Sequence, residues 1–210
     1  MKRARVLLAD DHPLTLEGLR AFLEPLAESV GTVRDGRALL EEALRLKPDL
    51  IILDITMPLL NGIDAAVQIK KHLPGVKLVF VTMHANPAYL EAALKAGGTG
   101  YVLKSAAREE LLDAITSVMN GRIYVTPSLS SEHLERFNDP SRAAASLRLS
   151  PREREILQLV AEGKAAKDIA FILSISVKTV AFHRENLKRK LGLRSTAELT
   201  KHALEQGIIS

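Results

Sequence analysis

The chain contains no cysteine among its 210 residues, which excludes disulfide bonds, thiolate metal ligands and cysteine nucleophiles. No apolar run approaches the roughly 18 residues of a membrane-spanning helix, and no signal-peptide pattern opens the chain. We therefore expect a soluble, cytoplasmic protein with no membrane partner. Hydrophobic residues make up 47% of the composition, which is enough for one large core or two modest ones.

Charge is unevenly distributed along the chain. From Arg148 onward, 12 Lys and Arg residues face 7 Asp and Glu residues, whereas the first 147 residues contain 17 and 18. A basic C-terminal part behind a near-neutral one favours a polyanionic partner for the basic part. Many basic faces are merely solvated, so charge alone leaves the partner open.

Short apolar runs alternate with amphipathic stretches up to about Gly121. The predicted strands are 4–10, 29–35, 49–54, 76–82 and 100–104. The predicted helices are 14–27, 37–46, 62–72, 87–96 and 106–120. Because the central strands are almost continuously apolar, this order predicts an α/β fold with a five-stranded parallel, doubly wound sheet covered by helices on both faces.

Polar residues end several of these strands. The segment LADDHP places two adjacent carboxylates, Asp10 and Asp11, where the first strand ends. Asp54, Thr82 and Lys104 end the third, fourth and fifth strands. Each residue alone is explained equally well as an ordinary polar strand end. Taken together they predict a site, because binding sites of parallel sheets form beyond the carboxyl ends of the strands.

The composition of this predicted site favours phosphoryl chemistry. Three carboxylates cannot all stay ionised at one edge without a compensating cation. Oxygen ligands suit Mg²⁺, and no His or Cys spacing indicates zinc. A carboxylate such as Asp54 can attack a phosphoryl group to give an acyl phosphate. Mg²⁺ and the Lys104 ammonium would neutralise the phosphoryl oxygens, and the Thr82 hydroxyl would hydrogen-bond the same group.

Residues 4–121 resemble the receiver domain of two-component response regulators. Besides the acid pair, the matching residues are Asp54 followed by Pro58 and Gly62, VT at 81–82, and Lys104. The resemblance implies that Asp54 is the phosphoacceptor and that Thr82 and Lys104 contact the phosphoryl group. It also implies a bound Mg²⁺, for which Mn²⁺ can substitute. The implied metal ligands are Asp10, Asp11, Asp54 and the backbone carbonyl of Thr56.

The resemblance assigns further roles around the site. Asp11 is expected to bind the metal directly and Asp10 through water, with His12 as a bystander. Tyr101 matches the family's switch aromatic, which turns inward on activation, although an ordinary half-buried strand tyrosine explains the sequence equally well.

Two residues depart from the family pattern. Ser105 follows Lys104 where many receivers have a Pro with a cis bond. A cis bond before any other residue costs about 3 kcal/mol, so the local backbone is left open. Met83 is bulkier than the residue often found after Thr82. It either restricts access to the acyl phosphate and slows its hydrolysis, or simply packs.

The rest of the chain divides into a connecting segment and a helical domain. We predict a receiver domain over 1–122, a linker over 123–146 with a short helix at 128–137, and a DNA-binding domain over 147–210. Ser150 to Glu153 form a capping box. Helices are expected from there to Glu162, over 167–173, over 177–191, and from Thr196 to about Gly207.

Two short helices joined by a three-residue turn, the second rich in Lys and Arg, indicate a helix-turn-helix. Residues 147–207 resemble the LuxR-type helix-turn-helix, through the segments SPRE, AEG, KDIA and TVAFH followed by KLG. The whole chain thus resembles a NarL/FixJ-type response regulator. This implies a cognate histidine kinase, double-stranded DNA as a partner, and a homodimer when phosphorylated, for which the helix 196–206 is a plausible surface.

The helix 177–191 can also be interpreted without the family. Val180, Leu187 and Leu191 share the face expected to pack on the core. Phe182, on the opposite face, does not fit a merely solvated helix but suits thymine methyl groups, and Glu185 suits a cytosine amino group. His183 is expected to be structural. The predicted DNA contacts are Lys178, Thr179, Ala181, Phe182, Arg184, Glu185, Lys188 and Arg189.

We therefore expect a transcription regulator switched by phosphorylation, and not a classical enzyme. One alternative is a phosphatase with an aspartyl nucleophile, but haloacid-dehalogenase-like enzymes have a second Asp two residues later, where this chain has Thr56. The other is a constitutive DNA-binding protein with a degenerate receiver, which the intact acid cluster argues against.

Overall fold

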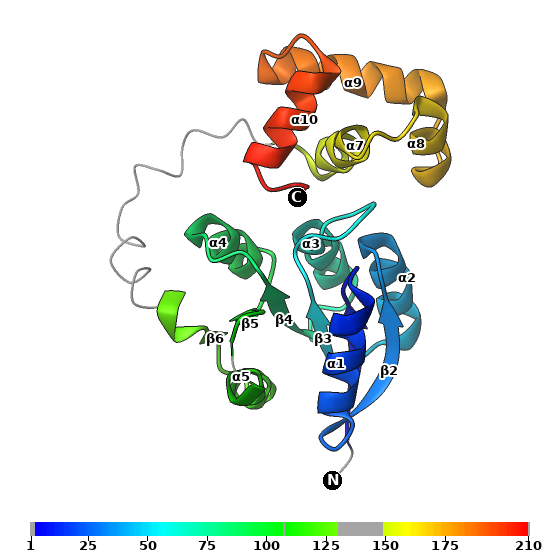
Figure 1. Ribbon diagram of the computed structural model, residues 1–210. Helices are drawn as coiled ribbons and strands as arrows, with labels where there is room; N and C mark the ends of the chain where they lie inside the picture. The colour runs from blue at the N-terminus through cyan, green and yellow to red at the C-terminus, as the bar shows by residue number, and fades with distance from the viewer. Residues whose placement is uncertain (1–2, 107, 130–148, 210) are drawn as a thin grey trace.

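The structure, a computed structural model, describes residues 3–106, 108–129 and 149–209. They form an α/β domain and a C-terminal helical domain that lies against it (Figure 1). The described residues of the first domain contain one parallel sheet in the order β2-β1-β3-β4-β5-β6. Its strands are β1 (Ala4–Ala9), β2 (Ala27–Val33), β3 (Leu50–Leu53), β4 (Lys77–Thr82), β5 (Gly100–Leu103) and β6 (Tyr124–Val125).

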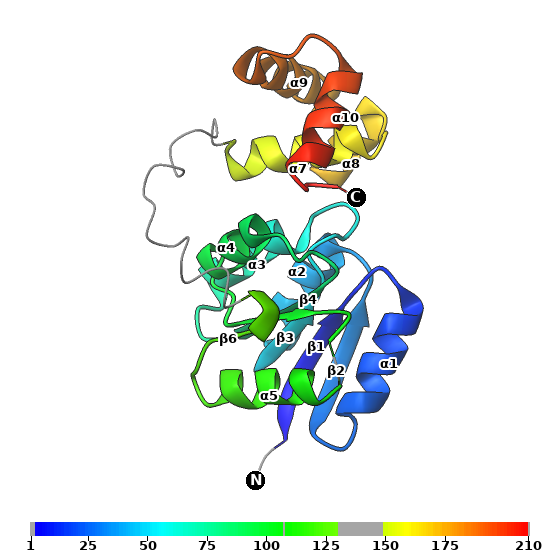
Figure 2. The same ribbon diagram turned by 60° about the vertical axis from the view of Figure 1, so that its left-hand side comes forward.

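Helices cover both faces of this sheet (Figure 2). They are α1 (Pro13–Leu23), α2 (Gly36–Leu46), α3 (Gly62–His72), α4 (Pro87–Lys95) and α5 (Arg108–Met119). Alternate residues of a strand face opposite sides. Thus Leu7 packs in the core cluster under α2, α3 and α4, whereas Val6 and Leu8 pack under α1 and α5. The predicted doubly wound α/β class is confirmed.

The sheet has one strand more than the five we predicted. Residues from Ile123 onward lack a strand pattern in the sequence, yet Tyr124 and Val125 pair with Gly100 and Tyr101. A strand of two residues is too short for any alternation to show. The second strand also begins earlier than predicted, at Ala27, and α1 ends earlier, at Leu23.

Side-chain caps begin the helices that flank the strand ends. The Asp35 carboxylate accepts hydrogen bonds from the backbone N–H groups of Arg37 and Ala38 at the start of α2. Asn61 accepts one from the Asp64 N–H at the start of α3. These bonds satisfy donors that the first helical turn leaves unpaired, and so hold the β3–α3 loop in place.

The C-terminal domain contains α7 (Pro151–Ala161), α8 (Ala166–Ile172), α9 (Val177–Leu191) and α10 (Thr196–Glu205). The predicted capping box is present, with Ser150 and Glu153 bonding reciprocally. Gly192 ends α9 in the left-handed conformation at φ 69°. Val180 and Leu187 are fully buried in the core and Leu191 packs against it, as the helical periodicity predicted.

Of the predicted linker over 123–146, residues 130–146 lie outside the described residues, and with them the predicted helix over 128–137 beyond its first two residues. Within the parts of the chain that the structure describes, no helix combines the length and the apolar character needed to cross a membrane.

Candidate functional site

The residues that end β1, β3 and β5 meet at one edge of the sheet, as their order along parallel strands predicts. The Lys104 Nζ lies 2.7 Å from Asp10 Oδ2 and 2.6 Å from Asp54 Oδ2. Both carboxylates are almost completely buried, and the lysine side chain is 13% exposed. A single ammonium group therefore bridges two buried acids.

Opposing effects act on the pKa of Lys104. Burial lowers it, but the hydrogen bonds that the ammonium donates to Asp10 and Asp54, and the charges of these acids, outweigh burial and raise the pKa above its usual value. Lys104 is thus held in its cationic form, which is the form that neutralises an incoming anion.

The acid pair that follows β1 lies beside this bridge. Asp10, Asp11, His12 and Asp54 each place one potential ligand atom within 4.8 Å of the others. Oδ1 of Asp11 is buried without a hydrogen-bond partner, although His12 Nδ1 approaches it to 2.8 Å. A carboxylate oxygen that accepts no aligned hydrogen bond, and that lies among other carboxylates, fits a hard cation that prefers oxygen ligands.

His12 lies closer to the acids than a bystander would. Its backbone N–H donates to Asp10 Oδ1 at 2.9 Å, and its ring nitrogen Nδ1 lies 3.3 Å from the same oxygen. Pro13 begins α1 as predicted.

His84 lies at the centre of contacts that the sequence did not predict. Its Nε2 lies 2.7 Å from the Thr56 hydroxyl, its backbone N–H donates to the Thr82 hydroxyl at 3.3 Å, and its carbonyl accepts from the Tyr101 hydroxyl at 2.7 Å. Its ring stacks on Tyr89 of α4 with centroids 4.2 Å apart. Burial lowers the pKa of His84, which favours a neutral ring.

Tyr101 is fully buried rather than half-buried. Its ring packs in the core under α2, α3 and α4, and burial raises the pKa of its hydroxyl. The inward orientation that the family resemblance associates with activation is therefore the one adopted in this structure.

The two departures from the family pattern are both accommodated. The described residues contain no cis peptide bond, so Lys104 and Ser105 are joined in trans. The Met83 side chain is 72% exposed, so it does not pack in the core. Whether it affects the lifetime of an acyl phosphate stays a prediction.

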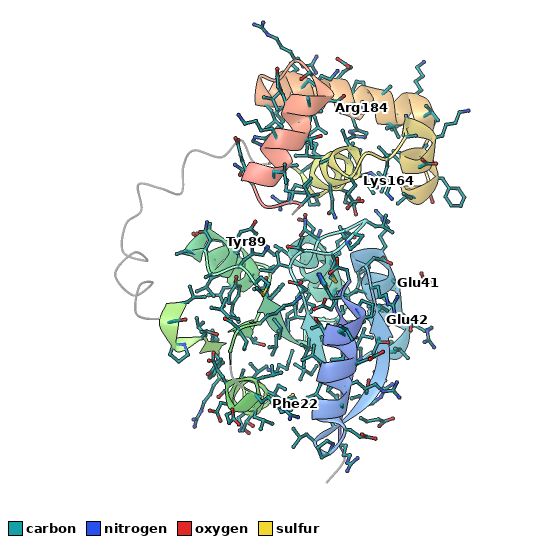
Figure 3. All side chains as sticks on the ribbon, in the orientation of Figure 1. Phe22, Glu41, Glu42, Tyr89, Lys164 and Arg184 are labelled. Carbon is teal, nitrogen blue, oxygen red and sulfur yellow. The ribbon has the colours of Figure 1, made fainter. Side chains whose placement is uncertain are left out.

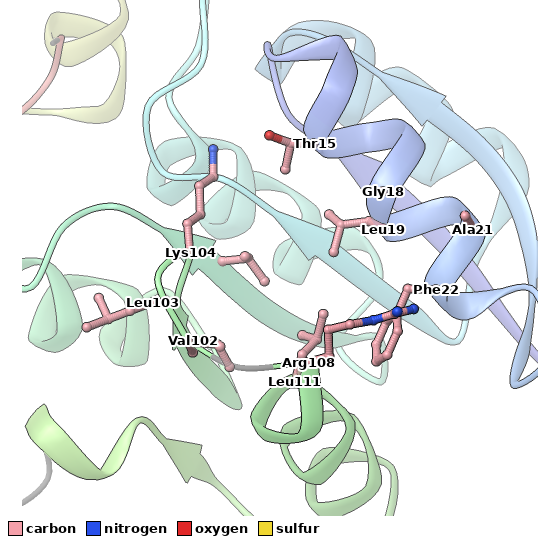
Figure 4. A pocket seen from close by; sticks show the side chains of 12 residues that line it. Thr15, Gly18, Leu19, Ala21, Phe22, Val102, Leu103, Lys104, Arg108 and Leu111 are labelled. Atoms are coloured by element: carbon pink, nitrogen blue, oxygen red, sulfur yellow. The ribbon is translucent and has the colours of Figure 1, made fainter.

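A groove of about 500 Å³ opens next to the strand-end site, between α1 and α5. Figure 4 shows Lys104 at one end of it and Phe22 with Arg108 at the other. The Arg108 guanidinium lies 4.9 Å from the centroid of the Phe22 ring, a cation–π distance.

The outer face of α9 carries the residues predicted to contact DNA. Phe182 is 63% exposed, and Ala181, Lys178, Glu185 and Arg189 are also exposed. An exposed phenylalanine on a helix whose Val180 and Leu187 are buried is consistent with a binding surface. Figure 1 shows this helix on the side of its domain away from the sheet.

Neighbouring contacts restrain several of these side chains. Arg184 donates to the Thr196 hydroxyl at the start of α10, and Arg189 donates to Asn186. Lys188 bonds Glu185 at 2.8 Å, which lowers the pKa of the Glu185 carboxyl. Thr179 bonds the Ser176 cap. His183 is half-buried, with its ring 5.9 Å from that of Phe182.

The N-terminal domain contacts α7 through polar groups. Arg154 Nε donates to both carboxylate oxygens of Asp64, at 2.9 and 3.0 Å. The Gln158 side chain accepts from the Asn61 N–H and donates to the Met57 carbonyl. Glu155 accepts from both Arg37 and Gln68. Met57 and Asn61 belong to the loop that follows Asp54. The hydrogen bonds of Gln158 therefore connect α7 to the loop that begins at the strand-end site.

Comparison with known families identifies both domains. Residues 6–116 match the response regulator receiver domain, and residues 147–203 match the bacterial regulatory proteins of the luxR family. The first match runs from β1 into α5, and the second from the start of α7 into α10.

Known proteins resemble the chain over its whole length. The transcriptional regulatory protein MctR of Rhizobium johnstonii is 39% identical, over 99% of this chain and 96% of MctR. The oxygen regulatory protein NreC of Staphylococcus carnosus is 33% identical, over 98% of this chain and 99% of NreC.

Solved structures of the response regulator RcsB share the fold. One from Salmonella typhimurium has a TM-score of 0.65 at 33% identity and covers 98% of this chain and 99% of RcsB. An RcsB–DNA complex has a TM-score of 0.60 at 33% identity, over 95% of this chain and 97% of RcsB. The chain therefore belongs to the NarL/FixJ-type response regulators, the DNA-binding two-component proteins that join a receiver domain to a LuxR-type helix-turn-helix.

Proposed function

We propose that Asp54 accepts a phosphoryl group from a histidine kinase and that this changes how the C-terminal domain binds DNA. The observation that carries the proposal is the bridge from Lys104 to Asp10 and Asp54. An ammonium already held between two buried acids is placed to bind an oxygen of a phosphoryl group on either of them.

The reaction uses few groups of this chain. An Asp54 carboxylate oxygen attacks phosphorus, and the bond from phosphorus to the kinase histidine breaks with its electrons returning to the imidazole. Lys104 neutralises charge on the phosphoryl oxygens and the Thr82 hydroxyl donates a hydrogen bond to one of them. Mg²⁺ bound by Asp10, Asp11, Asp54 and the Thr56 carbonyl would supply further charge neutralisation, and Mn²⁺ would substitute for it.

The proposed output is sequence-specific binding to double-stranded DNA. Phe182 and Glu185 are exposed and are proposed to read base edges together with Ala181, while Lys178, Thr179, Arg184, Lys188 and Arg189 are proposed to contact phosphates. One helix-turn-helix module usually binds weakly, so we propose a phosphorylated homodimer on paired half-sites. Both DNA complexes and dimers are known for RcsB.

The contact between α7 and the β3–α3 loop is the proposed link between the two events. Met57 and Asn61, which Gln158 bonds, follow Asp54 in the same loop. A phosphoryl group on Asp54 changes the charge at the start of this loop. We propose that this weakens the interface and releases the C-terminal domain for pairing.

DNA selection from random duplexes tests the proposal. The full chain is incubated with acetyl phosphate and Mg²⁺, or without them, and an Asp54→Ala variant is treated in parallel. We expect enrichment of one paired motif, with tighter binding only when wild-type protein has received the phosphodonor. Equal affinity in all three samples would contradict the phosphorylation switch, and the absence of any enriched sequence would contradict the DNA-binding role.

A second experiment tests the proposed metal site separately. In an Asp10→Asn/Asp11→Asn variant we expect no phosphorylation of Asp54 on a phosphate-affinity gel, because the cation loses two of its carboxylates. DNA binding by the C-terminal domain should persist at the level of the untreated wild type. Phosphorylation at the wild-type rate in this variant would contradict the assigned metal role.

A further inference from the structure

The strand-end site and the C-terminal domain are also joined by a second route, through His84. This residue follows β4 by two positions and touches three hydroxyl groups around the site. These belong to Thr56, Thr82 and Tyr101. Because His84 meets groups from the β3–α3 loop, from β4 and from β5, a displacement of any one of them reaches its backbone or its ring.

The route continues from His84 to the C-terminal domain through one aromatic ring. The His84 and Tyr89 rings stack with centroids 4.2 Å apart and planes inclined by 16°. Tyr89 lies on the part of α4 that faces the C-terminal domain (Figure 3). Its hydroxyl oxygen lies against Gly207, just beyond α10. A Cβ added at Gly207 would lie only 1.4 Å from this oxygen. Gly207 also has φ +62°, so only glycine suits this contact.

We infer that His84 is a positioning residue that couples phosphorylation of Asp54 to the release of α10, with the His84–Tyr89 ring stack as the link. The inference rests on the proposed function, because it requires a phosphoryl group on Asp54. When Thr82 turns its hydroxyl toward that group, the bond from the His84 N–H, already long at 3.3 Å, shifts or breaks. His84 then moves, and Tyr89 moves with the ring stacked on it.

Tyr101 cannot supply this movement by turning inward, because it is already fully buried and bonded to the His84 carbonyl. The route is also distinct from the contact of α7 with the β3–α3 loop. The α7 contact consists of polar bonds to the segment after Asp54, whereas the His84 route follows β4 to α4 and reaches the end of α10. Both routes touch the β3–α3 loop, because His84 Nε2 lies 2.7 Å from the Thr56 hydroxyl. A His84 variant nevertheless leaves the partners of Gln158 and Arg154 on α7 in place.

The chain has no cysteine, so two labels can be attached at chosen positions. Glu41 on α2 and Lys164 beyond α7 are exposed and lie on facing domains (Figure 3). With spin labels at Glu41→Cys and Lys164→Cys, distance distributions are measured by electron paramagnetic resonance before and after addition of acetyl phosphate and Mg²⁺. The phosphorylated fraction is measured in the same samples on a phosphate-affinity gel, and variants are compared at equal phosphorylated fractions.

We expect acetyl phosphate to shift the wild-type distances to larger values. In His84→Ala the shifted population should fall to less than half of that in the wild type. His84→Phe keeps a ring for the stack and should restore most of the response, which a merely destabilising effect would not predict. Tyr89→Ala should match His84→Ala, and the double variant should show no further loss, since residues that act in series are not additive.

Matched controls remove a similar side chain elsewhere. His72→Ala removes an exposed histidine at the end of α3, and Phe22→Ala removes a ring on α1, on the other face of the sheet. Both should keep the wild-type response. A wild-type response in His84→Ala, or a lost response in His84→Phe, would overturn the coupling role. If wild-type Asp54 took no phosphoryl group at all, the proposed function would fail and this inference with it.

Discussion

Lys104 shows how one residue holds the strand-end site together. Two carboxylates that are almost completely buried would repel each other and lack solvation, but the ammonium between them provides one bond to each. The arrangement is stable only while this cation, or a replacement for it, is present.

We predict that Lys104→Met destabilises the protein in the presence of a chelator. Removing the cation leaves Asp10 and Asp54 buried without their partner, which costs about 3 kcal/mol of unfolding free energy. Denaturant unfolding measures the loss, and Mg²⁺ should restore part of it by binding the folded state. The control is Lys95→Met, because Lys95 pairs with Glu91 on the surface and its loss should cost at most about 0.5 kcal/mol. Equal costs in the two variants would contradict the bridge.

The raised pKa of Lys104 predicts the direction of a pH effect. The folded pKa lies above the ordinary value of 10.5, so the stabilisation is fully present below 10.5 and is lost as the pH rises through the folded pKa. Unfolding free energy should therefore decline in the alkaline range. Tyr101, whose pKa is raised by burial, contributes with the same sign. The decline should thus be shallower in Lys104→Met than in the wild type, but still present; identical slopes would refute the assignment.

At the scale of elements, the β3–α3 loop depends on close backbone approach. Gly62 begins α3, and a Cβ there would lie 1.9 Å from the Asp54 carbonyl oxygen. Its N–H also donates to the Ile55 carbonyl at 2.7 Å. Any side chain at Gly62 must therefore push the first turn of α3 away from the end of β3.

We predict that Gly62→Ala costs about 3 kcal/mol of unfolding free energy and slows phosphorylation of Asp54, because the end of β3 must move. The control is Gly18→Ala on α1, where nothing lies within 4 Å of the added Cβ. That change should stabilise the protein by about 0.5 to 1 kcal/mol, through better helix propensity. Thermal unfolding and acetyl phosphate labelling measure both effects. A Gly62→Ala variant as stable as Gly18→Ala would show that the loop tolerates the shift.

The capping box of α7 supports the helix that forms the interdomain contact. Ser150→Ala removes the oxygen that accepts from the Glu153 N–H, and we expect a loss of about 1 kcal/mol. Glu153 keeps its bond to Lys190 of α9, so the effect should remain moderate. Denaturant unfolding followed by circular dichroism measures it. A Ser150→Asn variant, which retains a capping side chain, should lose much less, and a full loss there would argue against capping as the cause.

At the scale of the whole molecule, the docked arrangement leaves α9 outside the interface and engages α7 and the end of α10. The contact therefore does not cover the proposed DNA-reading face. We propose that it restricts instead how two copies of the C-terminal domain approach each other, because α10, the pairing surface that the family resemblance implies, ends where Gly207 lies against Tyr89. The interface thus fits control of pairing on DNA rather than control of access to a single module.

We predict that Gln158→Ala opens the interface without phosphorylation. Gln158 is 1% exposed, and its loss leaves the Asn61 N–H and the Met57 carbonyl without this partner. An unmade bond of this kind costs about 1 to 3 kcal/mol, so the equilibrium constant between docked and open forms should fall at least about fivefold. Small-angle X-ray scattering should show a larger radius of gyration, and DNA affinity should rise. Gln206→Ala, at an exposed position, is the control; an unchanged radius in Gln158→Ala would contradict the role of this contact.

Much of the fold could be predicted from periodicity and from residues that end strands. Apolar runs such as VLLAD and LIILD predict strands from the local sequence alone. Because the ends of parallel strands meet at one edge of a sheet, the sequence also predicts that Asp10, Asp54 and Lys104 lie close together. The strand at Tyr124 could not be predicted this way, because two residues show no alternation. The Asp64–Arg154 pair could not either, because its partners are 90 residues apart.

LADDHP illustrates the division between sequence and structure. The sequence by itself determined the α/β class, the helix-turn-helix and the acid cluster. The spacing of apolar residues, the helix-capping residues and the polar residues that end strands are all local properties of the sequence. Only the tertiary structure decided that Lys104 bridges Asp10 and Asp54, that His12 contacts the acids, and that His84 links three hydroxyl groups to Tyr89. The tertiary structure also decided which helices of the C-terminal domain contact the N-terminal domain. These contacts depend on packing between distant segments, for which a single sequence carries no periodic or local signal.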